Sequence, residues 1–145
     1  MTSQQQPGPP APSGRPVFTI EQLSSFAPGL GTLMPEIGTR TWKLYYAAKA
    51  QNWPLAKFQA GELRGLMLRG ATTRPRYEKD LKDYIQEHLE RLRAAIDAMD
   101  FEAFDKAFHE AVESANSYHV TTDHPFIVWK LPDYPPPDLD LTPLG

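Results

Sequence analysis

Apolar residues recur every three or four positions through the middle of the chain, which is the period of amphipathic α-helices. The spacing predicts two helices in the first half, over residues 35–51 and 54–70. Pro35 begins the first, because proline is favoured at the first helical position. Asn52 is suited to cap the second, and Gly70 is expected to end it.

The second half predicts two further helices, over residues 77–98 and 101–120, after a polar loop at 71–76. The inner side of the third helix includes His88, and its other side is densely charged. Asp100 is expected to cap the fourth helix. Its apolar stripe has steps of only three and four residues and consists of Phe101, Phe104, Phe108, Val112, Ala115 and His119.

The two ends of the chain have a different character. Thr19 and Gln22 have the spacing of a capping box, so a short helix is expected there, stopping at Pro28-Gly29, with its apolar side covering part of the core. Prolines are frequent in residues 1–16, and again beyond the extended run that begins at His124-Pro125.

These elements predict an all-α fold, an antiparallel four-helix bundle with a short N-terminal helix and extended proline-rich tails. We expect three parts: an N-terminal tail at 1–16, the bundle domain at 17–132 and a C-terminal tail at 133–145.

Composition narrows the possible functions. The net charge is −3, with 15 basic and 18 acidic residues interleaved, so a nucleic-acid interface is not expected. No apolar run is long enough for membrane insertion. The first residues do not resemble a secretory signal, so we expect a cytoplasmic protein, or a periplasmic one if a leader was removed. Without cysteine there are no disulfides or thiolate sites.

Two stretches resemble the bacterial cytochromes of the c-prime type. Residues 114–128 read S-A-N-S-Y-H-V-T-T-D-H-P-F-I-V, similar to the family's last helix and its exit. Residues 43–56, K-L-Y-Y-A-A-K-A-Q-N-W-P-L-A, and the pair Glu62-Leu63 are similar to an earlier part of the same proteins. The resemblance covers about residues 34–132. It implies a four-helix frame that carries a haem attached through C-x-x-C-H.

The resemblance places the two attachment cysteines at Ala115 and Tyr118, and the axial histidine at His119. Neither alanine nor tyrosine can form a thioether, so covalent haem attachment is excluded. His119 is the one metal ligand left, if haem is bound at all. Alternatively, His119 has a structural role, in which its imidazole bonds a backbone carbonyl or caps the last turn of the helix as a cation.

Tyr118 is expected to fill space that a porphyrin would use, although a phenol oxygen can also ligate iron. Trp42, Tyr45, Phe108 and Phe126 could line a haem pocket, but such residues are more often core. His88 is expected to be a hydrogen-bonded core histidine.

Other chemistry finds little support in the sequence. His109 and Glu113 are four residues apart, a spacing that suits an ion pair better than a metal site without a third ligand. His124 follows His119, but the helix is expected to end between them. No Glu-x-x-His repeat or catalytic motif is present, so we do not expect an enzyme.

The leading hypothesis is therefore a haem-free c-prime-like protein that serves as a binding or accessory subunit, with a protein partner or a homodimer. A strip at Tyr134, Pro135, Pro136 and Pro137 is suited to dock a partner, or else covers its own bundle. Leu66, Met67 and Leu68 offer more apolar positions than one inner face needs, which makes a dimer plausible. The alternative is non-covalent haem held by His119 in a redox or gas-binding protein.

Overall fold

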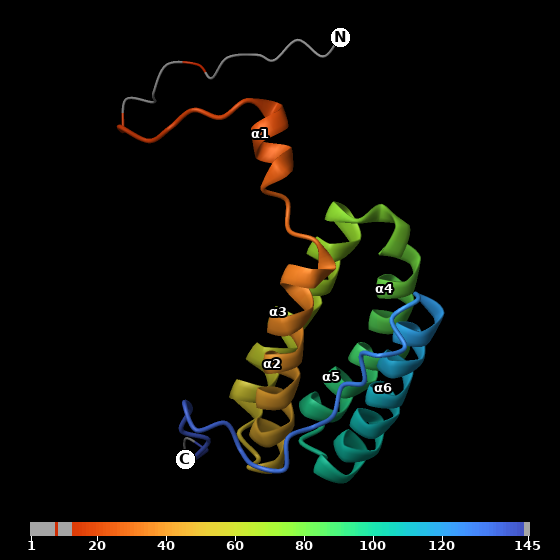
Figure 1. Ribbon diagram of the computed structural model, residues 1–145. Helices are drawn as coiled ribbons and strands as arrows, with labels where there is room; N and C mark the ends of the chain where they lie inside the picture. The colour runs from red at the N-terminus through yellow and green to blue at the C-terminus, as the bar shows by residue number, and fades with distance from the viewer. Residues whose placement is uncertain (1–7, 9–12, 144–145) are drawn as a thin grey trace.

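A computed structural model describes residue 8 and residues 13–143, and within these the protein is helical with no β-strand (Figure 1). The remaining residues, which include most of the expected N-terminal tail at 1–16, lie outside the described part. The helices are α1 (Ile20–Ser25), α2 (Leu30–Lys49), α3 (Trp53–Thr73), η1 (Pro75–Tyr77), α4 (Glu78–Tyr84), η2 (Ile85–Leu89), α5 (Glu90–Asp97) and α6 (Phe101–Thr121). The all-helical prediction is confirmed.

Helices α2 and α3 pack side by side and are joined by a short turn at residues 50–52. The expected start of the first helix at Pro35 is wrong, because α2 begins at Leu30 and contains the proline. The expected end at Gly70 is also wrong, since α3 continues to Thr73. Gly70 has a packing role instead, because a Cβ there would lie 2.9 Å from the Leu30 side chain.

The third predicted helix is present as one continuous helical run from α4 through η2 to α5. Its middle part, η2, is a π-helix, which the apolar pattern did not predict. Such wide turns accommodate an extra residue and are frequent at functional sites. The loop expected at 71–76 contains the end of α3 and the start of η1.

The fourth predicted helix agrees closely with α6. Asp100 accepts a hydrogen bond from the backbone N–H of Ala103, so the expected N-cap is confirmed. The side chain of Asn52 likewise accepts from the N–H of Leu55 at the start of α3.

The core lies between α2, α3, the α4–η2–α5 run and α6. Its largest fully buried side chains are Phe104, Phe108, Leu44 and Leu89. Burying an aliphatic or aromatic side chain of this kind contributes about 1.5–3 kcal/mol, so this cluster is the main source of stability. Leu66 and Met67 are buried and Leu68 is packed against the cluster, so the chain itself uses these apolar positions.

Helix α1 is formed as predicted, with both hydrogen bonds of the capping box between Thr19 and Gln22. Its expected role as a cover for the core is wrong. None of its residues is buried, Ile20 is 84% exposed, and the helix projects away from the other helices (Figure 1).

Residues 124–142, here called the C-terminal segment, have no helix and run from the end of α6 across the molecule towards the turn between α2 and α3 (Figure 1). Hydrogen bonds join this segment to side chains of α2 and α6 along the way. Within the described residues, no helix is both long and apolar enough to cross a membrane.

Candidate functional site

The C-terminal end of α6 contains the three residues that the resemblance assigns to a haem motif. His119 is half-buried, and its Nδ1 lies 2.9 Å from the carbonyl oxygen of Ile127 in the returning chain. Ala115 is half-buried on the same helix. The imidazole therefore bonds a backbone carbonyl, the geometry of the structural interpretation of His119.

Tyr118 does not line the interior. It borders a shallow surface depression with Ser114, Ser117 and Thr121, and its ring lies 6.3 Å from the ring of Tyr84. Partial burial raises the pKa of Tyr118, and the carboxylates of α4 and η2 raise it further. The residue expected to fill space that a porphyrin would use thus borders a depression on the surface of α6.

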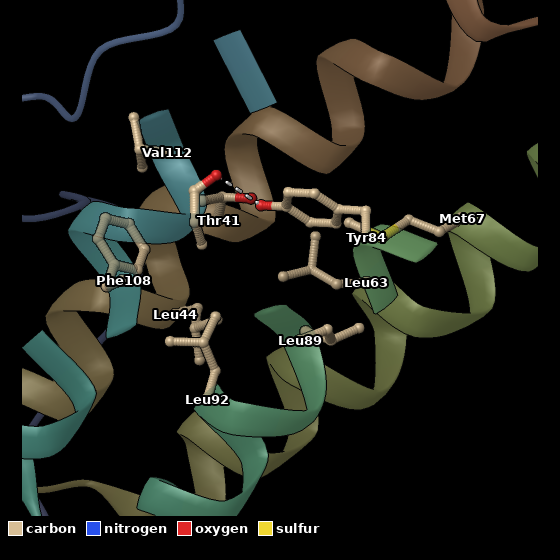
Figure 2. Close-up of a pocket in the computed structure, with 10 residues that line it drawn as sticks. Thr41, Leu44, Leu63, Met67, Tyr84, Leu89, Leu92, Phe108 and Val112 are labelled. Atoms are coloured by element: carbon tan, nitrogen blue, oxygen red, sulfur yellow. Dashed lines mark hydrogen bonds between the residues drawn. The ribbon is translucent and has the colours of Figure 1, made fainter. Parts of the chain in front are cut away.

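Tyr84 is the tyrosine that lines the small interior space. Figure 2 shows its ring pointing into the space between Thr41 of α2 and Leu63 of α3, and its hydroxyl donates to the carbonyl oxygen of Ala111 at 3.2 Å. Desolvation raises the pKa of Tyr84. The sequence did not single out Tyr84. The available signal was its neighbour Ile85, which belongs to the predicted inner side of the third helix.

The space that remains beside Tyr84 has a volume of about 20 Å³, enough for a single water molecule. It is lined by Thr41, Leu44, Leu63, Met67, Tyr84, Leu89, Leu92, Phe108, Ala111 and Val112 (Figure 2). A pocket for a ligand of cofactor size needs about 300 Å³ or more. The space beside Tyr84 is therefore too small to hold a haem.

Tyr45 and Phe108 belong to an aromatic core cluster. The ring of Tyr45 lies 4.8 Å from that of Phe108 and 6.0 Å from that of Phe101. Its hydroxyl donates to Asp105 at 2.9 Å, and burial together with this carboxylate raises the pKa of Tyr45 to about 12. His109 also contacts Asp105, at 3.2 Å, so its partner is Asp105 and the expected pair with Glu113 is replaced.

His88 lies within the π-helical turn. Only 14% of its side chain is exposed, which agrees with the predicted inner position. Its Nδ1 is buried and has no hydrogen-bond partner among the described residues, so the expectation of a hydrogen-bonded ring is wrong for this atom. Desolvation lowers the pKa of His88, while Glu87 and Glu110 oppose this shift.

The other predicted residues line neither the space beside Tyr84 nor the depression beside Tyr118. Phe126 is 78% exposed, and among the aromatic residues of the described chain its ring lies near that of His124 alone. The indole N–H of Trp42 donates to the carbonyl oxygen of Tyr134 at 2.8 Å, and the two rings are 5.4 Å apart. Pro136 is buried and Pro135 and Pro137 are exposed. The predicted docking strip thus lies on its own α2.

Three residues of this contact escaped the sequence analysis. Asn116 accepts from the N–H of Trp129 at 2.8 Å and donates to its carbonyl at 3.0 Å. Gly38 leaves room for the indole of Trp129, since a Cβ there would lie 2.9 Å from its Nε1. The sequence feature that could have revealed this contact is Trp129 itself, a large apolar residue in the proline-rich segment after α6.

In the part of the chain that the structure describes, no group of three His, Asp or Glu side chains could hold a metal ion. Comparison with other proteins extends this picture no further: neither family models, nor curated proteins, nor solved structures match the chain. The likeness to the c-prime cytochromes therefore stays an expectation that depends on the two motifs alone.

Proposed function

We propose that this protein is a haem-free member of the c-prime-like frame that acts as a binding or accessory subunit of a larger assembly. The observation that carries the proposal is the contrast between a closed interior and an open apolar arm. The space beside Tyr84 has a volume of only about 20 Å³, whereas the apolar residues of the N-terminal arm, residues 17–26, are all exposed.

The N-terminal arm has the features of a segment that binds a partner. Its exposed apolar side chains are Val17, Phe18, Ile20, Leu23 and Phe26. Exposed apolar clusters on a folded protein mark interaction sites, and helices commonly dock through anchors spaced three or four residues apart. The rings of Phe18 and Phe26 are 5.1 Å apart, so both ends of the arm contribute to one apolar surface.

The arm is presented at a defined place. The hydroxyl of Thr73 donates to the carbonyl oxygen of Pro28 at 2.7 Å, and the guanidinium of Arg74 donates to that of Ala27 at 3.4 Å. A Cβ at Gly29 would lie 2.9 Å from this guanidinium. The linker at residues 27–29, which joins the arm to α2, therefore passes close to the end of α3. Tethering of the linker reduces the freedom that a partner must remove on binding.

The test is purification of the full chain from its native source under gentle conditions, beside a variant with Ile20→Ser, Leu23→Ser and Phe26→Ser. We expect a stoichiometric partner, or a second copy, with the wild type and its loss with the variant. The matched control is Ser25→Ala, which lies on the side of α1 opposite these apolar residues. A wild type that elutes alone, or a partner that the triple variant retains, would contradict the role of the arm.

We further infer that α2, α3, the α4–η2–α5 run and α6 form an antiparallel four-helix bundle. The inference is supported by the short turns at 50–52 and 98–100, because short connections join antiparallel neighbours. Spin labels at Leu30 and Thr73, at opposite ends of the α2–α3 sequence, should give a short distance. A distance near the summed helix lengths would contradict it.

A further inference from the structure

The C-terminal segment is held mainly through its backbone. Trp42, Tyr46 and Asn52 donate side-chain hydrogen bonds to carbonyl oxygens of the segment, at 2.8 Å for the first two and about 3.4 Å for the third. Together with Gly38 and Asn116 these residues form a surface that we call the docking face. Because these hydrogen bonds go to backbone atoms, the docking face recognises the conformation of the bound segment more than its amino-acid sequence.

The hydrogen-bonding groups of the docking face match a proline-rich ligand. Proline has no N–H to donate, but the carbonyl groups around it remain acceptors. Trp42 and Tyr46 supply donors at this part of the segment, and their acceptors are the carbonyls of Tyr134, which precedes Pro135, and of Pro132. Aromatic surfaces with such donors are how proteins bind extended proline-rich peptides.

At its other end, the docking face binds a residue that is not proline and therefore has a backbone N–H to donate. The amide of Asn116 both accepts from and donates to the backbone of Trp129, at 2.8 and 3.0 Å. The indole of this residue lies against Gly38 of α2 and 6.4 Å from the ring of Phe108 in α6. Trp129 is thus the anchor, and the missing side chain at position 38 makes room for it.

Charge gives the contact a direction. Lys43 of α2 donates to Asp138 at 2.7 Å, beyond the prolines, and this bond lowers the pKa of the Asp138 carboxyl. The matching ligand therefore has an aromatic anchor first, prolines next and an acidic residue last.

We propose that the docking face is a binding site for extended, proline-rich peptide segments of another protein, and that residues 126–142 occupy it as an intramolecular ligand. The inference rests on the proposed role as a binding subunit and names the kind of segment a partner would insert. A partner segment with the same order of anchor, prolines and acid would displace the chain's own.

The experiment uses the full chain carrying Trp129→Ala, which weakens its own ligand, and a fluorescent peptide of residues 126–142 with the tryptophan intact. We expect saturable one-to-one binding, at least about tenfold tighter than to the wild-type chain, since buried aromatic anchors dominate such contacts. The same peptide with Trp129→Ala should bind at least about tenfold more weakly. Adding Gly38→Val to the chain should abolish binding, because its side chain occupies the indole position.

A second measurement covers the case in which Trp129→Ala fails to fold, as judged by circular dichroism. A protease site placed in the turn at 122–125 of the otherwise unchanged chain allows the folded protein to be cut. The freed segment should exchange with the labelled peptide. Absence of saturable binding to a helical Trp129→Ala chain, or loss of the cut segment without rebinding, would overturn the proposal. Neither result affects co-purification through the N-terminal arm, so the two claims fail separately.

Discussion

Tyr84 and Phe108 come from different helices and share the lining of the small interior space (Figure 2). The sequence assigned the filling of this space to Tyr118, because the resemblance aligns it with a lost cysteine. The helical register instead leaves Tyr118 at the surface, while the π-helical turn begins directly after Tyr84. Amphipathic spacing assumes a regular α-helix, so it could not reveal the extra residue in the turn after Tyr84, which belongs to a different helical run from Tyr118.

Truncating Tyr84 tests its part in closing the interior. We expect Tyr84→Ala to lower the free energy of unfolding by about 3 kcal/mol, because the ring leaves a cavity. Tyr84→Phe keeps the ring and loses only the bond to Ala111, so it should cost about 1 kcal/mol. Urea titrations monitored by circular dichroism measure both. Equal losses for the two variants would show that the ring does not fill the space.

His88 should make stability depend on pH. Its pKa is lowered in the folded state from the ordinary value of 6.5, so the unfolded chain binds the proton more readily. Stability is therefore full above about pH 6.5 and falls as the pH decreases towards the lowered folded pKa. The free energy of unfolding at pH 7.5 and 5.5, compared between wild type and His88→Leu, measures the effect.

The free energy of unfolding should fall less between pH 7.5 and 5.5 in His88→Leu than in the wild type. His109→Gln is the matched control, because its side chain is 61% exposed and its removal leaves the buried ring in place. A decline that is the same in wild type and His88→Leu would contradict the assignment. Groups facing His88 include Glu87 of η2, Arg91 of α5, Glu110 of α6 and the ring of Tyr84.

At the scale of elements, most of the helices could be predicted from spacing and caps, as α6 illustrates with Asp100 at its start. The start of α2 and the end of α3 could not, because proline at 35 is tolerated inside α2 and Gly70 serves packing. The position of α1 was also beyond sequence reasoning: its apolar residues predict burial but do not say against what.

Two glycines of α2 give a matched pair. A Cβ at Gly31 meets no atom within 4 Å, whereas one at Gly38 lies 2.9 Å from the Trp129 indole. Gly31→Ala should raise the free energy of unfolding by about 0.5–1 kcal/mol, since alanine favours a helix. Gly38→Ala should gain less and shift the ¹⁹F signal of fluorotryptophan at Trp129. Equal gains with no shift would contradict the close packing.

Leucines in α1 and α2 should respond differently to truncation. Leu23→Ser should change the free energy of unfolding by no more than about 0.5 kcal/mol, because this side chain is exposed. Leu44→Ala should cost about 2–5 kcal/mol, because Leu44 is fully buried. Chemical unfolding of both variants provides the measurement, and a large loss for Leu23→Ser would mean that α1 does cover the core.

For the whole molecule, the sequence indicated a helical protein and excluded thioether attachment, since no cysteine is present. It left open whether the strip at 134–137 faces a partner or its own helices. That choice depends on Trp42, Tyr46 and Asn116, which come from two helices far apart in the sequence and meet the segment only in the folded chain. Long-range contacts of this kind have no periodic signal.

Titration of the full chain with haemin, followed by absorbance, shows whether the interior is closed to a porphyrin. We expect no saturable Soret change, because the space that Tyr84 and Phe108 line has a volume of only about 20 Å³. A stoichiometric Soret band that disappears in His119→Ala would contradict the haem-free account, since it would show that a porphyrin binds with His119 as its iron ligand.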